Sequence, residues 1–429
     1  MGAGQRHGRA SRGALAASSF VVLLACAATV GAAAPVLMGP LPGPLPLFPP
    51  DHWWNTDISK APVDSASDAY IAWIGLNRGM HPDLGGDVSP GSADNYGFSY
   101  AVVDASQPLL AVQFNYADES DGVDHATNQS FPFYPVPAEA ITQPHWLEGG
   151  QPGNIDLRGQ QDRHLLIVDK DQNYLYELYN CWWSGAQWRC GSGAFYDMNT
   201  NNRRPDGWTS ADAAGLAILP GLVRHDEVYG AGEIGHAFRV TLRTSCGYVY
   251  PASHETTCSD ASSLPMGARL RLKSTTDLSS FTSDMLKILR AMQTYGLIMA
   301  DNGSDMYVSG TYDNNWDNGS LNPQFARVHA SDFEVVTLGW KPTRDLLRDA
   351  SITTFNPPPD LAAILPLGPG TPPAGNDYMA SINDGDTDKQ SDVVVDAAHP
   401  LVFFALSSSE TLHLVKASGT GFNTVRVRL

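Results

Sequence analysis

Several stretches of the chain alternate between hydrophobic and polar positions with the two-residue period of a β-strand. Residues 164–168 and 174–179 are rich in apolar and aromatic side chains, and the polar segment 169–173 separates them, which predicts a β-hairpin. Residues 268–273 alternate strictly between apolar and basic side chains, so we expect a strand with one buried and one solvated face. The pattern therefore predicts a main body made mostly of β-strands.

Other short apolar segments are bounded by turn residues and complete the predicted set of strands. They are residues 100–103, 109–114, 236–242, 248–250, 297–300 and 306–309. The last two flank Asp301-Asn302-Gly303, and we expect them to pair because Asn-Gly is a common hairpin turn. Residues 236–242 and 248–250 are expected to form another hairpin.

Two segments have the spacing of helices. Apolar residues recur every three or four positions over 281–292. Ser280 or Thr282 can cap the start of this helix, and Gly296 can close its end. A shorter helix is expected within residues 64–79. We therefore predict a mainly β fold of the sandwich or jelly-roll type, with one or two packed helices.

Proline-rich segments divide the chain into parts. Residues 35–50 are expected to form an extended spacer, and residues 341–376 a linker. The β-rich main domain is therefore expected to span residues 51–340. Residues 377–429 alternate in short stretches, which predicts a small C-terminal β module.

The N-terminus has the features of a secretory signal peptide, expected at residues 1–34. Three arginines precede the apolar segment 20–25, and small residues follow it. Leu23-Leu24-Ala25-Cys26 also resembles a bacterial lipobox, so lipidation of Cys26 is an alternative to simple cleavage. No run reaches the ~20 apolar residues that span a bilayer. We expect a secreted or extracellular protein without a transmembrane segment, with a cell-surface lipoprotein as the alternative.

Four further cysteines fit the oxidising environment outside a cell. Pairing of neighbours in sequence joins Cys181 to Cys190 and Cys246 to Cys258. The alternative is a zinc site, but the spacings lack the CxxC pattern of such sites. We therefore predict two disulfides and no bound metal.

Charge and aromatic content narrow the class of partner. The formal net charge is −18 at pH 7, so a polyanion would be repelled and nucleic acid is not expected as a partner. The chain contains 10 Trp and 16 Tyr, and such rings can pack against the apolar face of a sugar. We expect a polysaccharide or a cell-wall glycan as the partner.

Several known sequence motifs of cofactor-binding and catalytic sites are either absent from the chain or lie in the wrong structural context. Residues 230–235 match GxGxxG, but a charged segment precedes them and a strand pattern follows, whereas a dinucleotide loop needs a strand before it and a helix after it. The chain contains no GxxxxGK[ST], GxSxG or HExxH sequence. No cofactor is therefore predicted.

The densest group of charged residues lies just before the strand predicted at 236–242. We predict an acid–base pair in which Glu233 acts with Asp226 or Glu227. His236 is predicted to orient this pair or to act as a second base. The alternative is that these charges satisfy one another in a structural network of ion pairs.

Substrate-binding candidates are basic, acidic or aromatic residues on or beside predicted strands. They are Arg239, His164, Glu177, Trp182, Trp183 and Trp188. An arginine can bind an anionic group, and three tryptophans in one predicted disulfide loop can form a platform for stacking on sugars. The alternatives are that Glu177 is a solvent-facing strand residue and that the indoles cover a small core.

Several sequence blocks together resemble one known group of proteins. The blocks are residues 48–51, 54–59, 81–85, 162–164, 176–180, 221–227, 232–237, 266–269 and 300–304. Over roughly residues 48–338 the chain resembles a widespread family of exported bacterial proteins to which no activity is assigned. The resemblance implies export and a single main domain, followed in some relatives by immunoglobulin-like modules. It implies no catalytic residues.

Together these features predict a secreted carbohydrate-active enzyme, either a glycoside hydrolase or a polysaccharide lyase, that works by general acid–base chemistry. One alternative is a non-enzymatic surface protein that binds glycan or protein. Another is a metal-dependent hydrolase that uses His225, His236 and nearby carboxylates.

Overall fold

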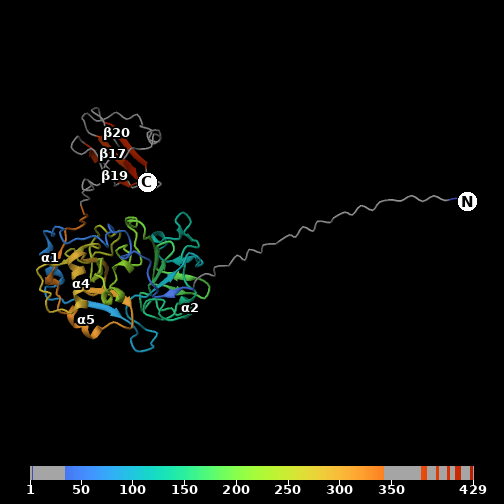
Figure 1. The fold of residues 1–429 in the computed structure, drawn as a ribbon, viewed down its shortest axis with the longest axis horizontal. Coiled ribbons are helices and arrows are strands. Elements are labelled where there is room, and N and C mark those ends of the chain that lie inside the picture. Colours follow the sequence, from blue (N-terminus) through green and yellow to red (C-terminus); the bar gives the residue numbers. More distant parts are fainter. Residues whose placement is uncertain are drawn as a thin grey trace. The chain divides into compact units, whose positions relative to one another are not determined.

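The computed structural model describes residues 34–342, together with Gly2 and five short strands between residues 378 and 428. The chain divides into two compact units, residues 1–340 and 341–429 (Figure 1). The predicted signal peptide with Cys26, and nearly all of the predicted linker 341–376, lie outside the described residues.

The first unit contains two main sheets, each with its own order of strands. The five-stranded sheet runs β1 (Val36–Leu37), β3 (Tyr100–Val103), β7 (Leu165–Asp169), β8 (Tyr174–Tyr179) and β11 (Ser192–Asp197). The six-stranded sheet runs β16 (Phe333–Val335), β13 (Arg269–Leu272), β14 (Leu297–Asn302), β12 (Phe238–Leu242), β15 (Tyr307–Tyr312) and β2 (His81–Gly85).

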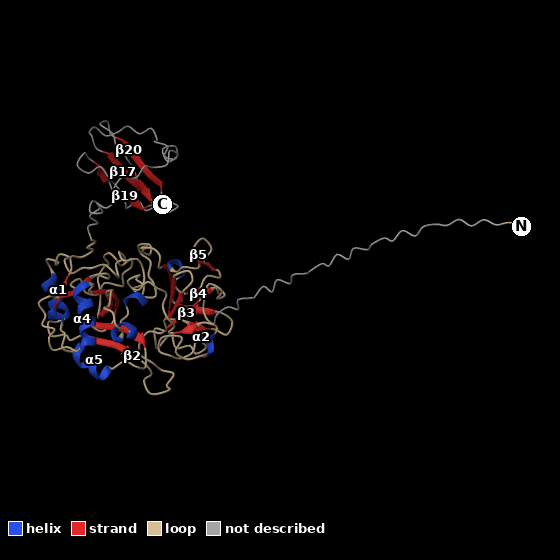
Figure 2. Cartoon of the chain, in the orientation of Figure 1, coloured by secondary structure: helices blue, strands red, loops and turns tan. Residues whose placement is uncertain are grey.

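Smaller sheets and short helices complete the first unit. The smaller sheets are β4 (Val112–Phe114) with β10 (Trp188–Cys190) and β9 (Trp182–Trp183), and β5 (Val123–Asp124) with β6 (Gln129–Ser130). The α-helices are α1 (Ser67–Ile74), α2 (Glu139–Thr142), α3 (His225–Tyr229), α4 (Ser283–Thr294) and α5 (Asn318–Phe325). Short 3₁₀ helices span Ala117–Glu119, Leu219–Gly221 and Ala330–Asp332. In Figure 2, α1, α4 and α5 gather in one half of this unit, and α2 lies in the other half with β3 and β4.

The fold is mostly sheet with few helices, as predicted, but the sheets are mixed. β3 pairs with β7 in parallel, β12 with β14 in parallel, and β15 with β2 in parallel. A jelly roll is built from antiparallel strands. The finer prediction of a sandwich or jelly roll is therefore not confirmed.

The predicted strands form except the one at residues 248–250, and only one of the three predicted hairpins does. β7 and β8 pair in antiparallel fashion across the turn at 170–173, which confirms the first. β14 and β15 do not pair, because β12 lies between them in the sheet. Residues 248–250 form no strand, and β12 pairs with β14 and β15 instead. The prediction was wrong on pairing because the hydrophobic pattern indicates which face of a strand is buried, and it does not determine which strand lies at its edge.

The five-stranded sheet has a hydrophobic core on each face. Along β7, Leu166 and Val168 belong to one core, while Leu165 and Ile167 belong to the other. The second of these cores also contains Trp188. Burial on both faces explains the unbroken apolar run of β7, since neither face needs polar side chains.

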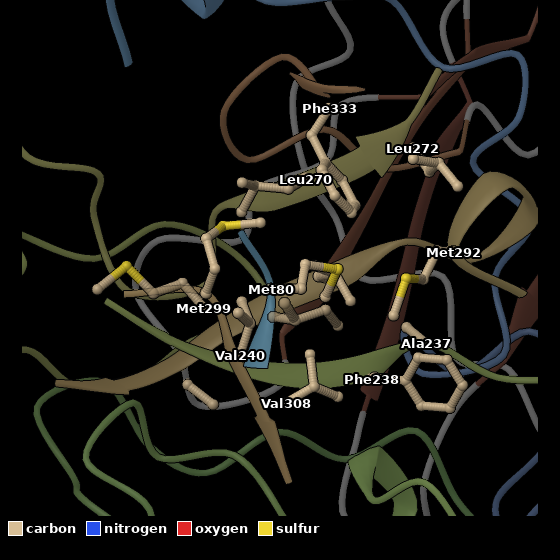
Figure 3. Packing of buried hydrophobic residues seen from close by; sticks show 14 of the residues in the cluster. Met80, Ala237, Phe238, Val240, Leu270, Leu272, Met292, Met299, Val308 and Phe333 are labelled. Atoms are coloured by element: carbon tan, nitrogen blue, oxygen red, sulfur yellow. The ribbon is translucent and has the colours of Figure 1, made fainter. Parts of the chain in front are cut away.

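The six-stranded sheet packs against α4. Thr282 Oγ1 caps this helix by accepting from Met285 N, and Gly296 follows its end with a φ of +76°, which confirms the predicted start and stop signals. Figure 3 shows Met292 of α4 near Leu272 of β13 and Phe238 of β12. These residues belong to the largest hydrophobic core of the molecule's described part.

The prediction that β13 has one solvated face was wrong. Arg269 and Arg271 are buried, because the segment at residues 52–61 covers their face of the sheet. Arg271 Nη1 donates to Ala61 O at 2.9 Å and Arg271 Nε donates to Glu334 Oε1 at 2.8 Å. Arg269 donates to Trp53 O. The basic positions therefore bind backbone and carboxylate oxygens in the interior rather than water.

Both predicted disulfides are present, Cys181–Cys190 and Cys246–Cys258. The first links the end of β10 to the residue before β9, and the second closes a loop between β12 and β13. No helix among the residues that the structure describes is long and apolar enough to cross a membrane.

The second unit is described by its strands alone. They are β17 (Tyr378–Asn383), β18 (Val393–Val395), β19 (Phe403–Ala405), β20 (Thr411–Lys416) and β21 (Arg426–Arg428). β17 pairs with β18 and β20 in antiparallel fashion, and β19 pairs with β21 in parallel. These strands agree with the alternation in the sequence of this segment.

Candidate functional site

The three predicted catalytic carboxylates, but not His236, line a hollow in the surface. Its volume is about 260 Å³, and Asp226, Glu227 and Glu233 contribute to its wall beside Arg224. The helix α3 carries Asp226 and Glu227, and the glycine-rich segment that follows it carries Glu233. The structure therefore brings the three predicted carboxylates to one place.

Glu233 is bound from outside this hollow. Its carboxylate accepts from Arg290 Nε at 2.8 Å and from Arg290 Nη2 at 2.7 Å, and its side chain is 63% exposed. The hydrogen bonds from Arg290 lower the pKa of Glu233. An ionised carboxylate held in an exposed ion pair is poorly suited to donate a proton at neutral pH.

Glu227 and His236 form a buried pair. His236 Nε2 lies 3.0 Å from Glu227 Oε2, and Arg224 Nη2 lies 2.7 Å from Glu227 Oε1. Burial alone would raise the pKa of Glu227, but His236 and Arg224 override burial and lower it. These contacts match the alternative of a structural ion-pair network, and the catalytic roles of these residues stay a prediction.

Two of the predicted substrate-binding residues, Glu177 and Trp188, are buried, as are two others, His164 and Arg239. Glu177 is fully buried and accepts hydrogen bonds from Ile218 N at 2.7 Å and Leu219 N at 2.8 Å. Burial nevertheless raises the pKa of Glu177 to about 7. Trp188 lies in a hydrophobic core. Burial argues against contact of either residue with a substrate.

Trp182 and Trp183 are half-buried and do not form a flat platform with Trp188. The guanidinium of Arg158 lies 4.8 Å from the centre of the Trp182 ring, and the Trp183 ring meets the Trp188 ring edge to face at 5.8 Å. The indoles therefore cover a small core, with one ring occupied by a cation.

A second polar group lies where the two main sheets meet. We call it the inter-sheet cluster; its members are Asp83, Glu148, His164, Asp212, Arg239, Asp301 and Ser309. Two of them, His164 and Arg239, are predicted substrate-binding residues. The others come from segments far apart in the sequence.

Strand register places one row of the inter-sheet cluster on the six-stranded sheet. Ser309 of β15 is the register partner of Asp83 on β2. Arg239 of β12 donates from Nη1 to Ser309 Oγ at 2.6 Å. Residues that are opposite each other on neighbouring strands project from the same face. Arg239, Ser309 and Asp83 therefore stand side by side.

The five-stranded sheet contributes the opposite part of the inter-sheet cluster. His164 immediately precedes β7, and its Nδ1 donates to Glu148 Oε2 while its Nε2 lies 2.9 Å from Ala211 O. The ring of Phe98 connects the two parts, since it lies 5.2 Å from the His164 ring and 5.5 Å from Arg239 Cζ.

Asp212 holds Arg239 in place. Arg239 Nε donates to Asp212 Oδ2 at 2.8 Å and Nη2 donates to Asp212 Oδ1 at 2.6 Å, a bidentate pair in which both side chains are buried. Burial alone would lower the pKa of Arg239, but Asp212 overrides burial and raises it. The guanidinium therefore stays charged and fixed.

Asp301 and Asp83 carry raised pKa values although both side chains are partly exposed. Burial, followed by the nearby charge of Asp212, raises the pKa of Asp301 to about 7. Burial and the charge of Glu148 raise the pKa of Asp83. A carboxyl group that titrates near neutral pH can either donate or accept a proton there.

The pair of His164 and Glu148 is ionised. Burial alone would lower the pKa of His164, but Glu148 overrides burial and raises it to about 9. His164 in turn holds the pKa of Glu148 below its usual value. The Glu148 side chain is 24% exposed, so solvent reaches a carboxylate that a buried imidazolium orients.

The inter-sheet cluster thus presents three partly exposed carboxyl groups: Glu148, whose pKa is lowered, and Asp83 and Asp301, whose pKa values are raised. No group of three or more His, Cys, Asp or Glu side chains in the described part of the chain is arranged to hold a metal ion. The arrangement is suited to proton transfer by paired carboxyl groups.

Sequence analysis missed Asp83, Glu148, Asp212 and Asp301 as site residues. Asp301 was interpreted as part of a hairpin turn, and Asp83 lies in a turn-rich region. Glu148 lies in a loop between α2 and β7. The sequence did single out His164 and Arg239. Each of them belongs to a different half of the inter-sheet cluster, so together they pointed to its position.

Comparisons of the chain with models of known protein families, with curated proteins and with solved structures gave no match. The resemblance of residues 48–338 to a family of exported bacterial proteins therefore stays a prediction.

Proposed function

We propose that this protein is a secreted glycoside hydrolase whose active site is the inter-sheet cluster. The observation that carries the proposal is that Arg239 interacts electrostatically with two partly exposed acids, the carboxyl group of raised pKa on Asp301 and the ionised carboxylate of Glu148. Glycoside hydrolysis uses such a pair, one group as general acid and the other as base or nucleophile. The two disulfides fit an extracellular protein.

Asp301 is the proposed general acid. Its carboxyl proton would pass to the oxygen of the leaving sugar as the glycosidic bond breaks. Burial and then the charge of Asp212 disfavour ionisation of Asp301, and Arg239 limits their effect, so that the pKa of Asp301 lies at about 7. Arg239 and Asp212 are therefore positioning residues that act through Asp301.

Glu148 is the proposed base or nucleophile. His164 binds Oε2 of Glu148, which leaves Oε1 to meet a water molecule or the anomeric carbon. Because the imidazolium of His164 is itself bound to Ala211 O, it fixes the carboxylate in one orientation. Asp83 lies close enough to Glu148 for their charges to interact, and it can bind a sugar hydroxyl there.

The two cationic side chains of the inter-sheet cluster, His164 and Arg239, are bound by acceptors of the protein, which favours a hydrolase over a polysaccharide lyase. A lyase removes a proton next to a carboxylate of the substrate, so it needs cationic groups free to bind that carboxylate. Both ring nitrogens of His164 are occupied by protein acceptors, and Arg239 is bound by Asp212 and Ser309. The proposed substrate is therefore a glycan without a carboxylate at the cleaved residue.

An aromatic pair supports sugar binding near this site. His81 and Tyr307 stack with ring centres 4.2 Å apart, and they are register partners on β2 and β15. Each lies two residues before a member of the inter-sheet cluster, Asp83 and Ser309, and so on the same face of the sheet. His81 is exposed, and such a ring can pack on the apolar face of a pyranose.

The test is hydrolysis of a panel of neutral and acidic polysaccharides and peptidoglycan by residues 35–429, followed by mass spectrometry of the soluble products. Asp301→Asn and Glu148→Gln are each expected to lower kcat by at least ~100-fold. Asp277→Asn makes the same chemical change on an exposed turn and serves as the matched control, which should keep full activity.

Three outcomes would contradict the proposal. Unsaturated products would identify a lyase. Loss of activity in Glu233→Gln together with retention in Asp301→Asn would place the chemistry in the hollow beside α3. Absence of product from any polymer, combined with binding of the wild-type protein to one of them, would identify a glycan-binding protein without catalytic activity.

A further inference from the structure

We infer that the protein binds a small monovalent anion beside Arg269, in the interior between β13 and the segment that carries His52 and Trp53. This inference is independent of the proposed hydrolase activity and concerns a different group of residues. It depends on a buried positive charge and on a set of hydrogen-bond donors that lack acceptors.

Among the side chains that the structure describes, no carboxylate pairs with the buried guanidinium of Arg269. It is 5% exposed, and one of its nitrogens, Nη2, donates to Trp53 O. Among residues 34–342, neither Nε nor Nη1 of Arg269 has a hydrogen-bond partner. Burial lowers the pKa of Arg269 to about 10, with only the Tyr250 hydroxyl acting in the opposite direction.

Other buried arginines in this unit show how such a charge is normally balanced. Arg239 pairs with Asp212, Arg204 with Asp121, and Arg271 with Glu334. Arg163 is fully buried as well, and its guanidinium donates to three backbone carbonyl oxygens. Arg271 is the more telling comparison, since it lies two residues from Arg269 on the same strand and the same face of the sheet. A buried charge without a partner is costly, so Arg269 calls for an anion that the described side chains do not supply.

The neighbouring polar groups are hydrogen-bond donors as well. His52 Nδ1 accepts from Trp54 N at 3.3 Å, so the ring proton lies on Nε2. Burial and the charge of Arg269 hold the pKa of His52 well below its usual value, which keeps this ring neutral. His52 Nε2 and Trp53 Nε1 are buried, and neither has a partner in the described structure. The two rings are in contact, with centres 3.7 Å apart.

The excess of hydrogen-bond donors and the positive charge of Arg269 together favour an anion over a water molecule at this place. A water can accept two hydrogen bonds, but it brings two hydrogens of its own that need acceptors. Asn55 Oδ1 is an unpartnered acceptor in the same segment and can take one hydrogen. It cannot neutralise a guanidinium. A small anion accepts from several donors at once and cancels the charge, which matches this set of groups better.

Chloride is the proposed occupant, since it is small, monovalent and abundant outside cells. The probes are sodium chloride and sodium formate, each compared with sodium gluconate at equal ionic strength. Chloride is expected to raise the Tm of the wild-type protein by a few degrees more than gluconate does. A rise with formate alone would identify a carboxylate as the ligand instead.

Arg269→Met should abolish this difference between chloride and gluconate. Arg271→Met is the matched control, because it removes a buried arginine that already has a carboxylate; it should lower the Tm and keep the response to chloride. Equal Tm values in chloride, formate and gluconate for the wild-type protein would overturn the inference.

A measurement on the wild-type protein guards against variants that fail to fold. Crystals grown or soaked in sodium bromide should show an anomalous peak within hydrogen-bonding distance of Arg269 Nε or Nη1. Ordered water at that position, with no anomalous signal, would overturn the inference as well.

Discussion

The ion pair of His164 and Glu148 determines which carboxyl group of the inter-sheet cluster stays ionised. His164 has a pKa of about 9 when folded, above the value of about 6.5 expected when unfolded. The folded state therefore binds this proton more tightly. The stability that results is complete below about pH 6.5 and is lost as the pH rises through about 9.

This linkage gives a prediction for the wild-type protein and His164→Gln. The free energy of unfolding of the wild type should fall by about 1.5 kcal/mol between pH 7.5 and 9, since the folded state holds an extra proton over most of this window. The variant should be less stable at pH 7.5 but should lack this contribution. Urea titrations at several pH values measure it. Equal slopes in the two proteins over this window would show that His164 is neutral when folded.

Single residues of the site were only partly predictable. Arg239 was found because a charged residue inside an apolar strand stands out in any sequence, and His164 because it lies at the entry of a predicted strand. Asp83, Glu148 and Asp301 lie in strands or loops where an acid is ordinary, and their raised or lowered pKa values come from neighbours distant in sequence. Proximity of that kind is set by the packing of the two sheets, which local patterns do not contain.

At the scale of elements, the two disulfide loops differ in burial. Cys181 and Cys190 are fully buried in a hydrophobic core, whereas Cys246 is partly exposed and Cys258 is exposed. Loops of similar length lose similar entropy when closed, so burial should decide which bridge contributes more to stability.

Replacing each cysteine pair by alanine tests this difference. Loss of Cys246–Cys258 should lower the free energy of unfolding by about 2–3 kcal/mol. Loss of Cys181–Cys190 should cost more, because the removed sulfur atoms also leave space in a packed core. The urea midpoints of the two double variants give the comparison. A larger loss for Cys246→Ala/Cys258→Ala would mean that the core around β9 and β10 adjusts to the change.

Strands and the longer helix were predictable as elements, and their neighbours in the sheet were not. The apolar runs of β14 and β15 and the helical period of α4 are local properties of the sequence. The insertion of β12 between β14 and β15 depends on contacts across the sheet, so the Asn-Gly turn alone misled the prediction. β13 shows the same limit, since its arginines find acceptors in a segment far away in the sequence.

At the scale of the first unit, two sheets with separate hydrophobic cores meet at a polar junction. The cores satisfy the apolar side chains of each sheet, and the inter-sheet cluster gathers charged groups that neither core could accept. A buried polar network of this kind is costly unless its members bind one another, which Arg239 with Asp212 and His164 with Glu148 do. Asp83 and Asp301 are only partly exposed and have raised pKa values, which is the basis of the proposed chemistry.

The pH dependence of glycan hydrolysis tests the central claim most directly, namely that protonated Asp301 is the general acid. With the best polymer from the panel, kcat should fall as the pH rises above about 7, because Asp301 then loses the proton that it must donate. Asp301→Asn should lack activity across the range, and Asp277→Asn should reproduce the wild-type profile. A wild-type rate that stays constant or increases from pH 6 to pH 9 would contradict the account.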